Sequence, residues 1–224
     1  MTNNNLPLPL HSHKNKMEFK LLRAYKPEML IETDITYIST NNGITYLICI
    51  KDVFSKEWYG YNYNTSCTSR DAINAVDNSI IRKFNGIIPD NITLRTDNGP
   101  QYISKEFNNY LKLLGIKHQY IERETPEENG DIASFHNSIK TDYIWVNEIN
   151  NLNDGKIIIE NAFYDYNNIR PHSTLDYYSP LQFLDKWNND KGFREYYRGF
   201  LNKLKESYKR RRNNYYNKVM INVS

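Results

Sequence analysis

Asp34 and Asp97 are the residues of this sequence whose placement most calls for a function. Asp34 lies in the middle of the β-branched stretch 30–39, where a carboxylate lowers stability unless something pairs with it. Asp97 follows the short stretch 92–96 and precedes Asn98-Gly99, a tight turn. Sites in α/β sheets are built where strands feed loops, although Asp97 taken alone suits an ordinary Asx-turn. The two acids become informative together with the motifs around them.

Four motifs surround these acids in a fixed order. They are Glu32-Thr33-Asp34-Ile35-Thr36-Tyr37-Ile38, Arg95 to Tyr102, Pro126 to Gly130 before Ser134-Phe135, and Tyr166 to Ser173 with Tyr178-Ser179-Pro180. Over roughly residues 28–185 they resemble the integrase catalytic core of bacterial insertion-sequence DDE transposases and retroviral integrases. The resemblance implies an α/β, ribonuclease-H-like fold: a five-stranded mixed sheet flanked by helices, with Asp34 on the central strand.

The chemistry implied by this resemblance is phosphodiester cleavage and strand transfer. Such chemistry uses two hard cations about 3.5–4 Å apart, commonly Mg²⁺ with Mn²⁺ as a substitute. Asp34 and Asp97 are then catalytic residues and metal ligands. The family's reaction is hydrolysis at the element end, followed by attack of the freed 3′-hydroxyl on target DNA.

The family's third acid is absent from this chain. In the family a Glu follows the second Asp with 35 residues between them, and that position is Ala133 here. We therefore expect a transposase by family that is catalytically disabled, still binds DNA, and forms a two-ion site only with Glu at position 133.

Two origins of Ala133 remain open. Alanine is rare in the chain, with 5 residues in 224, which favours an engineered Glu-to-Ala form. A domesticated, non-catalytic DNA-binding relative is the alternative, and codon 133 of the source gene separates the two. A nuclease of the same fold is disfavoured, because the motifs from Tyr166 to Pro180 resemble those of transposases.

DNA is the expected partner, and three regions are expected to contact it. Asn137 and Lys140 share a helix stripe with position 133, which the resemblance places along DNA, although a solvated face is the plain alternative. Arg170 and His172 are candidates too, but Pro171 between them also suits a structural turn. The third region is the basic cluster of Lys209, Arg210, Arg211 and Arg212.

Charge supports a basic tail. Residues 191–224 contain ten Lys or Arg and two Glu, whereas the whole chain has a net charge of +3. Basic segments bind polyanions by releasing counterions from phosphates, although a solvated helix explains the same charges.

Hydrophobic periodicity predicts the elements that position these residues. Three strands at 30–39, 44–50 and 57–63 form a β-meander, with Asn41-Asn42-Gly43 as the first turn. Helices are expected at 69–84 with Ser69 as the cap, at 104–115, at 126–146, and at 156–168 after a break at Asn153-Asp154-Gly155. Short strands are expected at 91–96 and 117–120.

These elements suggest three regions. Residues 1–28 form an arm or linker, 29–187 the integrase-type core, and 188–224 a basic amphipathic helical tail. The apolar stripe of the tail, from Phe193 to Tyr208, suits either packing on the body of the same chain or self-association. We expect a homodimer or larger assembly on DNA, because a transposase holds two DNA ends.

The absence of long apolar runs and the number of cysteines exclude several classes of protein. No apolar run approaches the roughly 20 residues of a membrane span, so no membrane partner is expected. Cys49 and Cys67 form no CxxC motif, which excludes a zinc ribbon and a disulfide scaffold. With the resemblance, this predicts a cytoplasmic, nucleoid-associated protein of a prokaryote.

Overall fold

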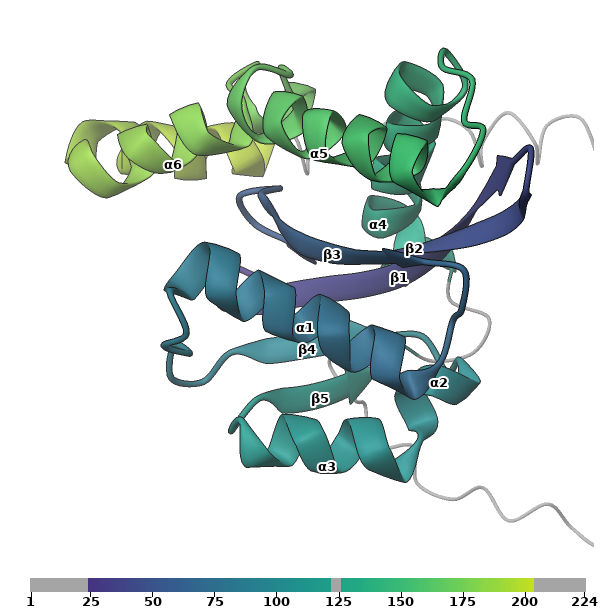
Figure 1. Ribbon diagram of the computed structural model, residues 1–224. Helices are drawn as coiled ribbons and strands as arrows, with labels where there is room; N and C mark the ends of the chain where they lie inside the picture. Colours follow the sequence, from purple (N-terminus) through teal and green to yellow (C-terminus); the bar gives the residue numbers. More distant parts are fainter. Residues whose placement is uncertain (1–23, 122–125, 204–224) are drawn as a thin grey trace, which may run out of the picture.

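A five-stranded mixed sheet forms the centre of the computed structural model, which describes residues 24–121 and 126–203 (Figure 1). The strand order is β3-β2-β1-β4-β5, so β1 is central. The first three strands pair antiparallel, and β4 and β5 continue the sheet in parallel. This confirms the expected sheet. The strands are β1 (Leu30–Thr40), β2 (Gly43–Asp52), β3 (Trp58–Asn64), β4 (Thr93–Thr96) and β5 (Lys117–Tyr120).

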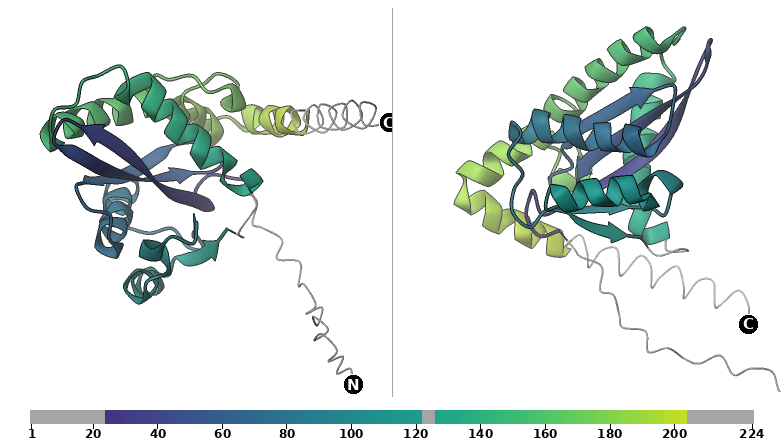
Figure 2. Two further views of the ribbon diagram at one scale, coloured as in Figure 1. Left: turned by 90° about the vertical axis from the view of Figure 1, so that its right-hand side faces the viewer. Right: turned by 60° about the horizontal axis from the view of Figure 1, so that its bottom comes forward.

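Helices cover both faces of this sheet. They are α1 (Ser69–Phe84), α2 (Pro100–Ile103), α3 (Lys105–Leu113), α4 (Pro126–Ile139), the π-helical turn η1 (Lys140–Ile144), α5 (Leu152–Asn168), the 3-10 turn η2 (Ser173–Leu175) and α6 (Pro180–Asn189). Residues 191–203 are also helical. Figure 2 shows α1 and α3 on one side of the sheet and α4 and α5 on the other. None of the helices in the described ranges is long and apolar enough to cross a membrane.

Strand alternation divides the core between the two faces. Ile31 of β1 packs in a cluster with α1 and α3, whereas Ile38 packs in a cluster with α4 and α5. Asp34 has the same parity as Ile38, so it belongs to the face that α4 covers. The β1–β2 hairpin turns where expected, and Gly43 in that turn has a φ of 118°, which favours glycine.

The cap of one helix and the start of another differ from the sequence prediction. Helix α1 begins at Ser69 as expected, but its cap is Thr68, which forms a capping box with Asp71. The break predicted around Asn153-Asp154-Gly155 is wrong, because Asn151 caps α5 and the helix runs through these residues. Gly155 belongs there because it packs directly against the ring of Tyr63, where a Cβ would overlap that ring.

The helix predicted over 126–146 is regular only as far as Ile139. Lys140–Ile144 form a π-helical turn, in which the amide of Trp145 donates to the carbonyl oxygen of Lys140 at 2.8 Å. Such insertions are concentrated at functional sites. Here the insertion follows directly after the stripe that carries Ala133 and Asn137.

The start of the expected tail packs on the chain's own body. Phe193 and Tyr197 are buried in a cluster with Phe54 and Phe183. This is the first of the two interpretations of the apolar stripe, and the cluster joins residues on both sides of position 188. Phe200 and Leu201 of the stripe pack against the same cluster, whereas Tyr196 is exposed. Leu204 and Tyr208, the cluster 209–212 and residues 1–23 of the expected arm lie outside the described residues.

Candidate active site

The structure brings the two predicted acids together at one end of the central strands. The pairing of β1 with β4 runs in parallel from Leu30 opposite Thr93 to Glu32 opposite Arg95. Two residues further along, this register brings Asp34 level with Asp97. Neighbouring strands lie about 4.8 Å apart. Carboxylates at these positions are close enough to interact electrostatically.

Burial and like charge both act on Asp97. Burial raises the pKa of its carboxyl group, and the negative charge of Asp34 raises it further. The amide of Gly99 donates to Asp97 Oδ1 at 2.9 Å and opposes that rise. This bond is the Asx-turn considered from the sequence. It orients the carboxylate at the strand end and does not exclude a second role.

Helix α4 covers Asp34. His136 Nδ1 lies 3.5 Å from Asp34 Oδ2, and the amide of Ile35 donates to Asp34 Oδ1 at 2.8 Å. Ala133 is exposed and lies one turn before His136, on the same side of the helix. A longer side chain at position 133 would therefore start close to Asp34. Sequence reasoning missed His136, although its i+3 spacing from position 133 was a usable signal.

Tyr102 of α2 supports the acids from the other face of the sheet. Its buried hydroxyl lies 3.2 Å from Thr33 Oγ1. Burial raises the pKa of this phenol well above its usual range, and the charges of Asp34 and Asp97 add to the effect. Tyr102 therefore stays a neutral phenol beneath the site. It belongs to the second motif, but its position did not distinguish it in the sequence.

The acids fit one hard divalent cation, since carboxylate oxygens are the ligands that Mg²⁺ prefers. Burial is the main cause of the raised pKa of Asp97, and the smaller rise that the charge of Asp34 adds would be relieved by a cation between the two carboxylates. Within the described ranges no three His, Cys, Asp or Glu residues form a cluster suited to a metal.

The residues expected to contact DNA lie in different surroundings. Asn137 is exposed and Lys140 is half-buried at the first position of η1. Arg170 is engaged within the chain: its Nε donates to Asp142 Oδ2 at 2.9 Å, and one terminal nitrogen donates to Ser138 Oγ at 3.1 Å. The cluster Lys209–Arg212 is outside the described residues.

His172 is a neutral side chain at physiological pH. Burial lowers its pKa to about 4, with further contributions from the positive charges of Arg170, Lys51 and Lys56. The imidazole packs edge-on against Tyr166, with ring centroids 4.6 Å apart. His172 alone is therefore not a cationic contact for phosphate. The DNA contact expected for it from the sequence would have to be made by a neutral ring.

A second charged group lies on the neighbouring side of α4, and sequence reasoning missed it. Lys51 and Lys56 both bind the carboxylate of Asp131, at 2.5 and 2.9 Å. Asp131 is half-buried, which by itself would raise its pKa, but the two ammonium groups hold that pKa well below its usual range. Asp131 is thus unsuited to replace an acid at position 133. Lys51 directly follows the apolar run of β2, and this was the sign in the sequence that a buried ion pair could be present.

Comparison with known proteins establishes the family. Two family models, both described as integrase core domain, match residues 24–126 and 114–180. The chain belongs to the integrase core family.

Two curated transposases are similar to this chain. The transposase for insertion sequence element IS904 of Lactococcus lactis is 29% identical over 174 residues, which is 76% of this chain and 66% of that protein. Transposase InsF for insertion sequence IS3A of Escherichia coli is 28% identical over 154 residues, 68% of this chain and 52% of that protein. This chain thus spans between half and two thirds of these relatives.

A solved structure confirms the fold. The integrase catalytic core domain of HTLV-2, determined in complex with magnesium, matches with a TM-score of 0.56 and 20% identity. The match covers 72% of this chain and 99% of that core domain. The sheet and its flanking helices are therefore the ribonuclease-H-like fold of integrase catalytic cores.

Proposed function

We propose that this chain is the catalytic core of an insertion-sequence DDE transposase whose third acid has been lost, leaving a protein that binds DNA but turns over poorly. The proposal is supported above all by the placement of Asp34, on the central strand, level with Asp97, which directly follows the adjacent parallel strand. The similarity to two insertion-sequence transposases supports the same reading.

The roles of individual residues follow from their positions. Asp34 and Asp97 would hold Mg²⁺, or Mn²⁺ in its place, and a Glu at position 133 would complete a two-ion site. Cations bound there activate the attacking oxygen and stabilise the leaving oxygen. The Gly99 amide fixes the Asp97 carboxylate, and His136 lies against Asp34. Ala133 supplies no ligand, which is the reason for the expected inactivity.

DNA is the proposed substrate, both as element ends and as target. Asn137 and Lys140 continue the side of α4 that faces Asp34, so DNA at the acids would pass along them. Arg170, His172 and the cluster Lys209–Arg212 are proposed as further contacts. We propose a homodimer or larger assembly on DNA, in the prokaryotic cytoplasm at the nucleoid.

A strand-transfer assay tests the proposal. Three proteins are compared with Mg²⁺ or Mn²⁺ on DNA carrying the terminal sequences of the encoding element: the chain as it stands, Ala133→Glu, and Ala133→Glu with Asp97→Asn. We expect metal-dependent cleavage and joining only from the second. Activity in the unchanged chain would mean that another carboxylate replaces position 133.

The alternative is a domesticated relative that binds DNA without catalysis. Ala133 itself is the observation that favours it. This alternative predicts specific binding to element ends, an alanine codon in the source gene, and no activity in the Ala133→Glu protein on the correct ends.

A further inference from the structure

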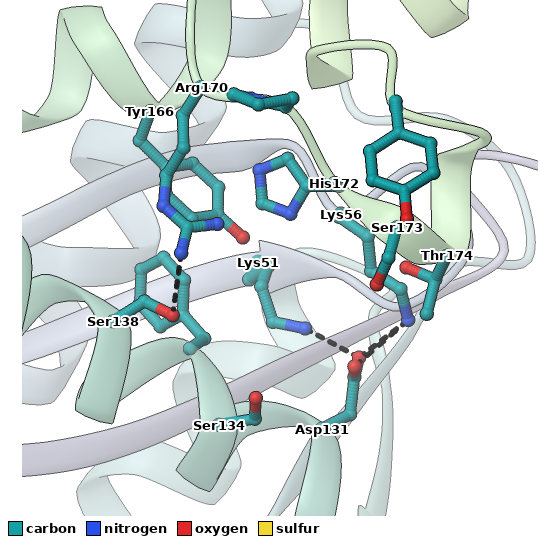
Figure 3. Close-up of a pocket in the computed structure, with 13 residues that line it drawn as sticks. Lys51, Lys56, Asp131, Ser134, Ser138, Tyr166, Arg170, His172, Ser173 and Thr174 are labelled. Carbon is teal, nitrogen blue, oxygen red and sulfur yellow. Dashed lines mark hydrogen bonds and ion pairs between the residues drawn. The ribbon is translucent and has the colours of Figure 1, made fainter.

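A basic pocket lies beside the candidate active site, between α4 and the segment that follows α5 (Figure 3). Its volume is about 340 Å³. Lys51 and Lys56 extend into it toward Asp131, and Arg170 borders it through its bond to Ser138. Ser134, His172, Ser173 and Thr174 are among the other polar side chains that line it.

The pocket carries more positive than negative charge. Lys51 and Lys56 share the single carboxylate of Asp131, and Arg170 is paired with Asp142. These groups therefore leave one positive charge in excess. The side chain of Lys51 is only 1% exposed and that of Lys56 17%. Cations held this far from water attract an anion more strongly than surface lysines do.

One buried polar atom in the pocket lacks a partner. His172 Nε2 is shielded from solvent and has no hydrogen-bond partner among the described residues. Leaving such an atom unpaired costs free energy. A negatively charged oxygen beside it would favour the protonated ring, which donates from this nitrogen. The hydroxyl groups of Ser134, Ser138 and Ser173 offer additional donors.

Helix α4 connects this pocket with the acids. At 3.6 residues per turn, positions 131, 134 and 138 form one stripe, and positions 133, 136 and 140 form the stripe beside it. The first stripe lines the pocket, whereas His136 of the second lies against Asp34. A group bound in the pocket would therefore lie next to the acids without occupying them.

We propose that this pocket binds one phosphate group, held by Lys51, Lys56 and the hydroxyl groups of α4, in competition with Asp131. The phosphate comes either from the DNA backbone flanking the reacting strand or from free phosphate. Only the first source rests on the proposed function.

Binding of inorganic phosphate, measured by calorimetry without DNA or metal, tests the proposal. The unchanged chain should bind phosphate saturably. Lys56→Gln should weaken binding about tenfold, the effect of one charge-assisted hydrogen bond. Ser134→Glu should abolish binding, and because Ser134 is exposed this protein keeps its fold. Asp131→Asn should tighten binding by removing the competing carboxylate.

Lys112→Gln is the matched control, because Lys112 is exposed on α3, on the opposite face of the sheet. It should bind phosphate like the unchanged chain. Absence of saturable binding, or equal binding by Ser134→Glu, would overturn the proposal. Competition with a duplex of arbitrary sequence then separates the sources: displacement of phosphate identifies the DNA backbone, and no displacement identifies free phosphate.

The same measurement separates this pocket from the proposed catalytic function. Asp34→Asn should leave phosphate binding unchanged while it removes metal binding. Intact phosphate binding without strand transfer by the Ala133→Glu protein would refute the proposed catalysis alone.

Discussion

Restoring the third acid should convert the site into a stronger metal site, and this can be measured without DNA. In Ala133→Glu the new side chain extends from a position one helical turn before His136, and His136 lies 3.5 Å from Asp34. It would join Asp34 and Asp97; burial raises the pKa of Asp97, and the negative charge of Asp34 raises it further. Without metal, the third negative charge should lower the melting temperature.

Added Mg²⁺ should reverse this loss and exceed it. A ligand present at 100 times its dissociation constant stabilises the native state by about 2.7 kcal/mol. For a domain of this size each kcal/mol raises the melting temperature by about 2–4 °C. Ala133→Glu should therefore gain roughly 5–11 °C at that Mg²⁺ concentration. The unchanged chain should gain less, because two carboxylates bind the cation more weakly than three.

Thermal unfolding with increasing Mg²⁺ is the assay. Ala133→Gln is the matched control, because it has the same length as Glu without the charge, and it should respond like the unchanged chain. Ala133→Glu combined with Asp34→Asn should lose most of the gain. Equal shifts in Ala133→Glu and Ala133→Gln would refute the reasoning, because position 133 would then lie too far from Asp34 and Asp97 to share a cation.

Three further predictions concern stability. Burial raises the pKa of Glu57 to about 7 from 4.5, so its contribution is present below pH 4.5 and is lost as pH rises through 7. Between pH 4.5 and 7 the free energy of unfolding of the unchanged chain, measured in urea, should fall by about 3 kcal/mol relative to that of Glu57→Gln. If the free energies of unfolding of the two proteins changed in parallel with pH, this prediction would be contradicted. Phe193→Ala should lower the free energy of unfolding by about 3 kcal/mol, because its side chain is buried. Tyr196→Ala should lower it by under about 1 kcal/mol, because that side chain is 55% exposed. Equal losses in the two variants would show that the helix at 191–203 does not pack on the body of the chain. Gly155→Ala should lower the free energy of unfolding by about 1–3 kcal/mol. The same substitution should lower it less in a protein that also carries Tyr63→Leu. An equal loss in both proteins would show that the Tyr63 ring is not what excludes a side chain at position 155.

Local patterns in the sequence were sufficient for much of the fold. Alternating residues predicted β1 and an aromatic-rich run predicted β3, each to within a few residues. The Asn-Asn-Gly turn predicted β2 and the hairpin that joins it to β1. Helix α1 spans the predicted 69–84, because its apolar face repeats with helical period. The placement of Asp34 on the central strand and of Asp97 after its neighbour followed from the family motifs. These features depend on residues close together in the chain.

Other features could not be read from local patterns. The break predicted near Asn153 failed because turn-forming residues were weighed without Tyr63, the distant neighbour that requires Gly155. The π-helical turn after Ile139 leaves no mark in apolar periodicity. His172 is neutral because the surrounding elements bury it and so lower its pKa, which local sequence does not reveal.

The sequence by itself determined the order of strands and helices and the placement of Asp34 and Asp97, because turn chemistry, hydrophobic period and motif spacing are local. Only the tertiary structure decided which charged side chains meet. Lys51 and Asp131 are 80 residues apart. The tertiary structure likewise decided which aromatic rings pack together, as when Phe54 of the loop between β2 and β3 meets Tyr197 of the helix at 191–203. Such contacts arise from strand register and from the docking of helices on the sheet. They place a basic pocket and an acidic site on adjacent sides of one helix.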